Sequence, residues 1–222
     1  MNPTFDRLAT VMRRLIHFPT ILVMPKYRAV LQDLTIELYV SQRKLPFLAG
    51  ADALIVPVGP DLKMIFGVAK MARDRGADIV QVEASRVAPL RPGDAFIGTG
   101  ARYRYKYTAL AVIFDESKRT SAEIIVRAVT TAVAKLRAAG ARSVVLADMT
   151  ENLLAQPNWI TPEQRRKTAA ITAKIMVDAI VACGKNAKTV KIWCSEPDNA
   201  PFFVEELKHI HDRERRAQAA LA

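Results

Sequence analysis

The second half of this chain alternates long helical segments with short apolar ones, and that order constrains its fold more than any other feature. Residues 121–139 carry apolar side chains at helical spacing and end at Gly140, and residues 162–183 repeat the pattern. Apolar runs of strand length follow at residues 143–147 and 188–194. Long helices between short buried strands are typical of a parallel or mixed sheet with helices on both faces. The sequence therefore predicts an α/β protein.

The first half of the chain adds shorter elements of the same two kinds. A Pro-Gly turn at residues 92–93 and single glycines mark their ends. We expect a helix over residues 66–75 that ends at Gly76, and a last helix over residues 201–211. We expect strands within residues 27–40 and at residues 53–56, 79–83, 95–98 and 103–114.

The N-terminal segment is predicted to be an extension to one main domain. Residues 2–17 carry apolar side chains at helical spacing, and two prolines follow before residue 27. We therefore divide the chain into a helical extension, residues 1–26, and a domain of residues 27–222. Docking on its own domain is the simplest role for this helix, and binding to a partner or a membrane surface are the alternatives.

Residues 51–76 predict where a ligand would bind. They read as a buried strand, a loop with glycine and proline, and a helix that begins beside Gly67. In α/β proteins such a loop lies at the carboxyl end of a strand, where backbone N–H groups and the helix dipole favour an anionic ligand.

Composition limits the class of protein. The 222 residues can bury one sizeable core, and no apolar run reaches the roughly 20 residues that span a bilayer. The two cysteines, Cys183 and Cys194, lie in apolar segments, which predicts reduced, buried thiols. These features indicate a soluble cytoplasmic protein. The formal charge of +11 is compatible with nucleic acid or another polyanion as a partner, but the basic residues are dispersed.

Several short blocks in order resemble the macro domain, a three-layer α/β/α module that binds ADP-ribose and related nucleotides. The resemblance covers about residues 27–211 and depends more on the order of the blocks than on any one of them. The blocks are QDLT at residues 32–35, ADALIV at 51–56, GVA at 67–69, RPGDAFI at 91–97, the strand at 107–114, and the final strand and helix at 189–194 and 202–210.

The resemblance implies a set of ligand-binding residues and a role for one of them. Asp33 matches the family aspartate that accepts a hydrogen bond from the adenine amino group, although an ordinary turn carboxylate is an equal alternative. The implied ligand-binding residues are Asp33, Leu34, Pro57, Val58, Gly59, Pro60, Gly67, Val68, Asp148, Met149, Thr150, Glu151 and Asn152.

The chain departs from the macro-domain pattern at the positions that carry its chemistry. Pro57 and Pro60 stand in the segment where the family has asparagines, and proline offers neither a side-chain amide nor a backbone N–H. Of the glycine-rich segment only Gly67 remains. Asp148 and Glu151 would repel a diphosphate unless they are turned away or bridged by a cation, and we expect them to be solvated in a loop.

The sharpest alternation of residue types is RYRYKY at residues 102–107. In a strand, Arg102, Arg104 and Lys106 would line one face and the three tyrosines the other. These cations are possible contacts for nucleic acid, and a half-buried strand with its tyrosines on the core is the simpler alternative.

Three functions from different classes follow. The first is a non-catalytic binding module for ADP-ribose or a related nucleotide, with altered specificity. The second is a basic scaffold that binds nucleic acid or a protein partner and has a vestigial pocket. The third is an ADP-ribosyl hydrolase, which the two prolines disfavour. We assign no catalytic residue, metal ligand or cofactor, and the sequence leaves the oligomeric state open.

Overall fold

The fold comes from a computed structural model that describes residues 24–41, 50–99, 105–153 and 161–219. The helix predicted within residues 2–17 lies outside the described residues, as does most of the predicted extension.

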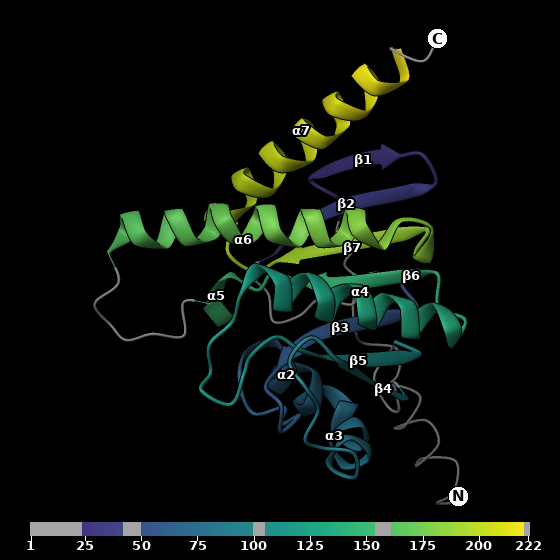
Figure 1. The fold of residues 1–222 in the computed structure, drawn as a ribbon, viewed down its shortest axis with the longest axis vertical. Helices are drawn as coiled ribbons and strands as arrows, with labels where there is room; N and C mark the ends of the chain where they lie inside the picture. Colours follow the sequence, from purple (N-terminus) through teal and green to yellow (C-terminus); the bar gives the residue numbers. More distant parts are fainter. Residues whose placement is uncertain (1–23, 42–49, 100–104, 154–160, 220–222) are drawn as a thin grey trace, which may run out of the picture.

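One mixed sheet organises the described chain, in the order β1-β2-β7-β6-β3-β5-β4 from the top to the bottom of Figure 1. β2, β7, β6, β3 and β5 run parallel, and β1 and β4 lie antiparallel at the two sides. The strands are β1 (Tyr27–Leu31), β2 (Leu34–Val40), β3 (Ala53–Val58), β4 (Ala95–Thr99), β5 (Tyr107–Val112), β6 (Ser143–Ala147) and β7 (Thr189–Cys194).

Helices cover both faces of this sheet, as the alternating pattern predicts. Helices α4 (Ala122–Ala138), α6 (Pro162–Cys183) and α7 (Ala200–Ala219) share one hydrophobic core with one face. On the other face, α2 (Gly67–Ala72) and α3 (Asp78–Ser85) pack over β3 and β4 (Figure 1). The result is a three-layer α/β/α arrangement.

Local signals placed the long helices accurately. The side chain of Ser121 accepts the backbone N–H of Ile124 and caps α4, and Gly140 follows its end with φ of 92°. Thr161 and Gln164 form a reciprocal capping box at the start of α6. These capping residues are adjacent in sequence to the helices that they cap, which explains why both helices could be predicted.

The strand predicted at residues 79–83 is wrong, because this segment belongs to α3. Val80 and Ala84 are buried four residues apart, whereas Ile79 and Val82 are exposed. Four-residue spacing of buried side chains is the period of a helix rather than a strand. Gly76 does interrupt the preceding helix, with φ of 112°, but the chain continues through a short π-helical turn into α3.

Gly98 sets how closely α3 packs on β4. A Cβ atom there would lie 2.8 Å from Cγ1 of Val80, which is fully buried, and 2.9 Å from Oε2 of Glu83. We expect Gly98→Ala to lower the free energy of unfolding by about 1–3 kcal/mol, because a packed core has no room for an added methyl group. Urea denaturation measures this. Gly59→Ala is the matched control, since its Cβ would meet only Asp61 Oδ1 at 3.5 Å, and a loss as large as that of Gly98→Ala would contradict the prediction.

Candidate functional site

The carboxyl ends of the parallel strands bring two of the predicted segments together. Residues 57–60 end β3 and begin its loop, and residues 148–150 follow β6, the strand hydrogen-bonded to β3. Gly67 and Val68 begin α2, which packs on β3. Figure 1 shows α2 and α5 (Thr150–Leu153) at this edge of the sheet. This edge is the candidate site.

Asp33 and Leu34 do not belong to it. Asp33 lies in the turn between β1 and β2, and Leu34 begins β2, which runs parallel to β3 through β7 and β6. Both residues are therefore at the amino edge of the sheet, about one strand length, or about 20 Å, from the carboxyl edge. Leu34 is also buried in the core. The structure therefore does not bring Asp33 to the candidate site, where the QDLT resemblance implied a role in adenine recognition.

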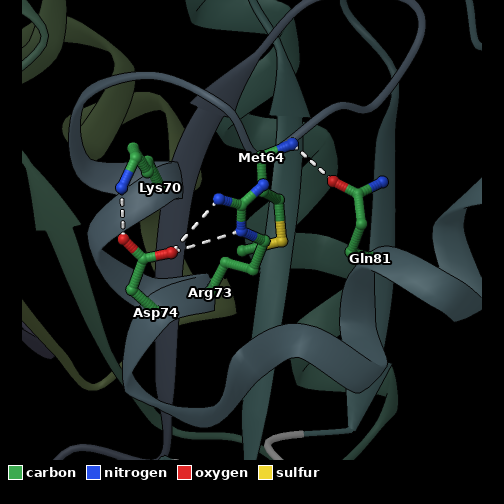
Figure 2. A network of polar contacts seen from close by, with 5 residues as sticks. All are labelled: Met64, Lys70, Arg73, Asp74 and Gln81. Carbon is green, nitrogen blue, oxygen red and sulfur yellow. Dashed lines mark hydrogen bonds and ion pairs between the residues drawn. The ribbon is translucent and has the colours of Figure 1, made fainter.

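The loop of residues 59–66 is folded back onto α3. Gln81 holds it: its Oε1 accepts the backbone N–H of Met64 at 2.5 Å, and its Nε2 donates to the carbonyl of Leu62 at 3.3 Å. Figure 2 shows the Met64 bond, with Lys70 and Arg73 around the carboxylate of Asp74 on the neighbouring helical turn. The hydrogen bond from Lys70 lowers the pKa of Asp74. The loop is thus anchored at its middle.

The same loop fills the space beneath it with bulky side chains. Leu62 and Met64 are fully buried and join the core of the α2–α3 face, which also contains Val58 and Trp193. Pro57 lies past the point where β6 stops pairing with β3, so its missing N–H interrupts no β6 hydrogen bond. A ligand at this site would therefore lie on the loop and not under it.

Asp148 is turned inward, which corrects the expectation of a solvated loop carboxylate. Only 6% of it is exposed. Its Oδ1 accepts the backbone N–H of Thr150 at 2.9 Å and the Thr150 hydroxyl at 2.6 Å, and its Oδ2 accepts Nδ2 of Asn199 at 3.0 Å. Met149 and Thr150 are buried as well, and α5 contains Glu151 and Asn152. This segment ties β6 to the start of α7.

Two large apolar side chains are exposed at the outer side of the loop. Phe66 is 73% exposed and Ile65 is 41% exposed, directly before Gly67, which has φ of 51°. Lys63 and Asp61 form an exposed ion pair of 3.3 Å nearby in the loop. The loop therefore presents an aromatic ring and a charged pair to solvent.

The alternating strand predicted at residues 102–107 is wrong where the structure describes it. Tyr105 and Lys106 form a bend, and β5 begins only at Tyr107. Tyr105 is buried in the core of the α2–α3 face, whereas Tyr107 packs against the opposite core. The bend places the two rings on opposite sides of the sheet. Arg102 and Arg104 lie outside the described residues, and Lys106 is exposed at the amino edge.

Both cysteines are buried and unpaired, as predicted. Burial raises the pKa of Cys183 to about 12. Burial also raises the pKa of Cys194, and the neighbouring carboxylate of Asp148, 3.6 Å from the sulfur, adds to that shift. Both thiols therefore keep their protons well above the pH at which an exposed thiol loses its own.

These shifts predict a loss of stability in alkali. Above the ordinary thiol pKa of 9.0 the unfolded chain releases protons that the folded chain retains, so unfolding becomes more favourable as pH rises. Each thiol should lower the free energy of unfolding by up to about 1.4 kcal/mol per pH unit between pH 9 and 12. Urea denaturation as a function of pH measures this slope. The double variant Cys183→Ala/Cys194→Ala should have a shallower slope, and an unchanged slope would contradict the assignment.

Sequence reasoning missed the partners that fix this edge. Asn199 is 51 residues from Asp148, and no local pattern links the two. Gln81 was hidden by the strand wrongly predicted around it. Among the described residues, no cluster of three or more His, Cys, Asp or Glu side chains has metal-binding geometry, and no helix is long and apolar enough to cross a bilayer.

Comparison with known proteins identifies the fold. No protein-family model matches the sequence, and no curated protein matches it. Among solved structures, the Oceanobacillus iheyensis macrodomain with MES bound has a TM-score of 0.67 at 13% identity, over 84% of this chain and 97% of that one. The same macrodomain with ADP gives the same values. The Trypanosoma brucei macrodomain in complex with ADP-ribose has a TM-score of 0.61 at 11% identity, over 77% of this chain and 68% of that one.

Proposed function

We propose that this chain, which has the macrodomain fold, is a non-catalytic binding module for ADP-ribose or a related nucleotide. The observation that carries the proposal is the fold itself, which extends over 97% of a macrodomain structure that holds ADP. In open α/β sheets, ligands bind outside the carboxyl ends of the strands, and the loop after β3 lies there.

The loop of residues 59–66 favours a binding mode in which the nucleotide lies on its outer side. Leu62 and Met64 fill the space beneath it, so a ligand would contact the outer side of the loop. There the exposed ring of Phe66 is suited to stack on a base, and exposed Gly67 leaves its backbone accessible to a ribose or phosphate. This arrangement favours altered specificity over the usual binding mode of the fold.

The side chains at the strand ends support binding without catalysis. Pro57, Val58, Gly59 and Pro60 carry no group that can move a proton. The carboxylate of Asp148 is buried and accepts hydrogen bonds from Thr150 and Asn199, so it is not presented to a substrate. A hydrolase would need a general base elsewhere at this edge.

Isothermal titration calorimetry with ADP-ribose, ADP and AMP tests the proposal. We expect binding of at least one of them, and a loss of about 10- to 100-fold in affinity for Phe66→Ala, because stacking on a base contributes about 1–3 kcal/mol. Val82→Ala is the matched control, since Val82 is 56% exposed on α3 and apolar. No binding of any nucleotide, or an equal loss in both variants, would contradict the proposal.

A second assay tests the non-catalytic part separately. Incubation with a mono-ADP-ribosylated protein should release no ADP-ribose, at protein concentrations where an active macrodomain hydrolase completes the reaction. Any release of ADP-ribose would overturn this part of the proposal, and release that survives removal of the Asp148 carboxylate would place the catalytic group elsewhere at the edge.

A further inference from the structure

We propose that the amino edge of the sheet, opposite the candidate nucleotide site, binds single-stranded nucleic acid. Three exposed cations stand directly before parallel strands there: Lys188 before β7, Arg142 before β6 and Lys106 before β5. The strand order places their backbones in one row. Three inter-strand spacings separate the ends of the row, or about 14 Å, which suits contact with successive phosphates of one strand.

The backbone fixes this row. The N–H of Lys188 donates to the carbonyl of Arg142 at 2.9 Å, so these two residues are direct neighbours. Between Arg142 and Lys106 lies Asp52, whose Oδ2 accepts the N–H groups of Arg142 and Ser143 at 2.8 and 3.0 Å. Its carboxylate is turned onto the start of β6, so the acid that the described strand starts place between these cations is engaged by the backbone.

A cavity of about 370 Å³ continues the row beyond Lys188. It lies between the β1–β2 turn, the end of α6 and the second half of α7. Its volume is within the range of sites that bind small ligands or single rings. Its lining includes the apolar Leu31, Leu34, Val181 and Ile210 and the polar Gln32, Asp33, Arg213 and Glu214.

This lining matches a nucleobase better than a phosphate. Apolar walls accept a planar ring, and an arginine such as Arg213 can stack on it. Asp33 is exposed, and a carboxylate accepts hydrogen bonds. It would therefore favour adenine or cytosine, which carry an exocyclic amino group, over thymine or uracil, which carry none. Because duplex bases are stacked and paired, the cavity selects a single strand.

Fluorescence anisotropy with labelled 12-mers of oligo(dA), oligo(dC) and oligo(dT) tests this surface. We expect oligo(dA) and oligo(dC) to bind about tenfold more tightly than oligo(dT). A plot of log Kd against log salt concentration should have a slope of about 2, from three phosphate contacts at about 0.7 each. The triple variant Lys106→Gln/Arg142→Gln/Lys188→Gln should lose at least tenfold in affinity and most of this slope.

Two further variants test whether the oligonucleotide binds at the amino edge. The triple variant Arg119→Gln/Arg166→Gln/Lys167→Gln removes the same charge from exposed residues elsewhere and should bind nearly as well as the wild type. Asp33→Ala should abolish the preference for oligo(dA) without weakening oligo(dT). Equal losses in the two triple variants, an unchanged base preference in Asp33→Ala, or displacement of the oligonucleotide by saturating ADP-ribose would overturn the proposal.

Discussion

Replacing Trp193 with alanine is expected to lower the free energy of unfolding by about 3–5 kcal/mol, the largest single-residue effect in the candidate site. Trp193 is buried on β7 beside Ala147 of β6 and belongs to the core that Leu62 and Met64 complete. Removing the indole leaves a cavity in the core that Leu62 and Met64 share. Urea denaturation followed by circular dichroism measures the change without relying on the fluorescence of the lost side chain.

Trp193→Phe separates packing from hydrogen bonding at this position. The buried Nε1 of Trp193 has no hydrogen-bond partner in the described part of the chain. Phenylalanine keeps most of the apolar volume and removes only this unused donor, so we expect a cost below about 1.5 kcal/mol. A cost for Trp193→Phe equal to that of Trp193→Ala would mean that the indole N–H has a partner and that packing is not the main contribution.

Asp148→Ala is expected to cost about 2–4 kcal/mol of unfolding free energy. The substitution leaves the N–H and hydroxyl of Thr150 and the amide of Asn199 without their acceptor, inside a buried segment. Urea denaturation again measures the loss. Asp61→Ala is the control, because the ion pair of Asp61 with Lys63 is exposed and should contribute less than about 0.5 kcal/mol.

Asp148→Asn tests the direction of these hydrogen bonds. The asparagine amide has one oxygen where the carboxylate has two, so it can accept hydrogen bonds from Thr150 or from Asn199 but not from both. Its NH2 group would then face the donor of the other residue, and two donors cannot form a hydrogen bond. We expect most of the alanine penalty to remain. Full stability in Asp148→Asn would contradict the hydrogen-bond assignment.

The elements that could be predicted from sequence are those whose signals are local. Ser121 and Gly140 mark the ends of α4 within a few residues of its apolar stripe, and the resemblance to macro domains correctly anticipated the three-layer fold. The strand predicted at residues 79–83 belongs to α3, in which Val80 and Ala84 are buried and Ile79 and Val82 are exposed. Which side of this segment is buried depends on its packing against β4, and no local sequence signal reports that contact.

The candidate site was less predictable because its residues depend on long-range register. Asp33 matched a short motif, but the match fell on a tight turn at the amino edge, and only the strand order reveals which edge that is. The inward orientation of Asp148 depends on Asn199, which comes from the far end of the chain. Residues that agree with a motif in sequence can thus lie on opposite edges of one sheet.

The two proposed surfaces also differ in how they should respond to salt. Binding at the carboxyl edge would involve the exposed ring of Phe66 and backbone groups near Gly67, whereas the amino edge presents Lys106, Arg142 and Lys188. Nucleotide binding should therefore weaken much less with salt than oligonucleotide binding. The comparison can be made with one protein preparation.

Backbone amide NMR during a titration with ADP-ribose tests the central claim most directly. The account predicts concentration-dependent shifts for Gly59, Phe66, Gly67 and Val68 at the carboxyl edge, with little change for Arg142 and Lys188 at the amino edge. Shifts confined to the amino edge, or no shifts at millimolar ADP-ribose, would contradict a nucleotide site at the carboxyl ends of the strands.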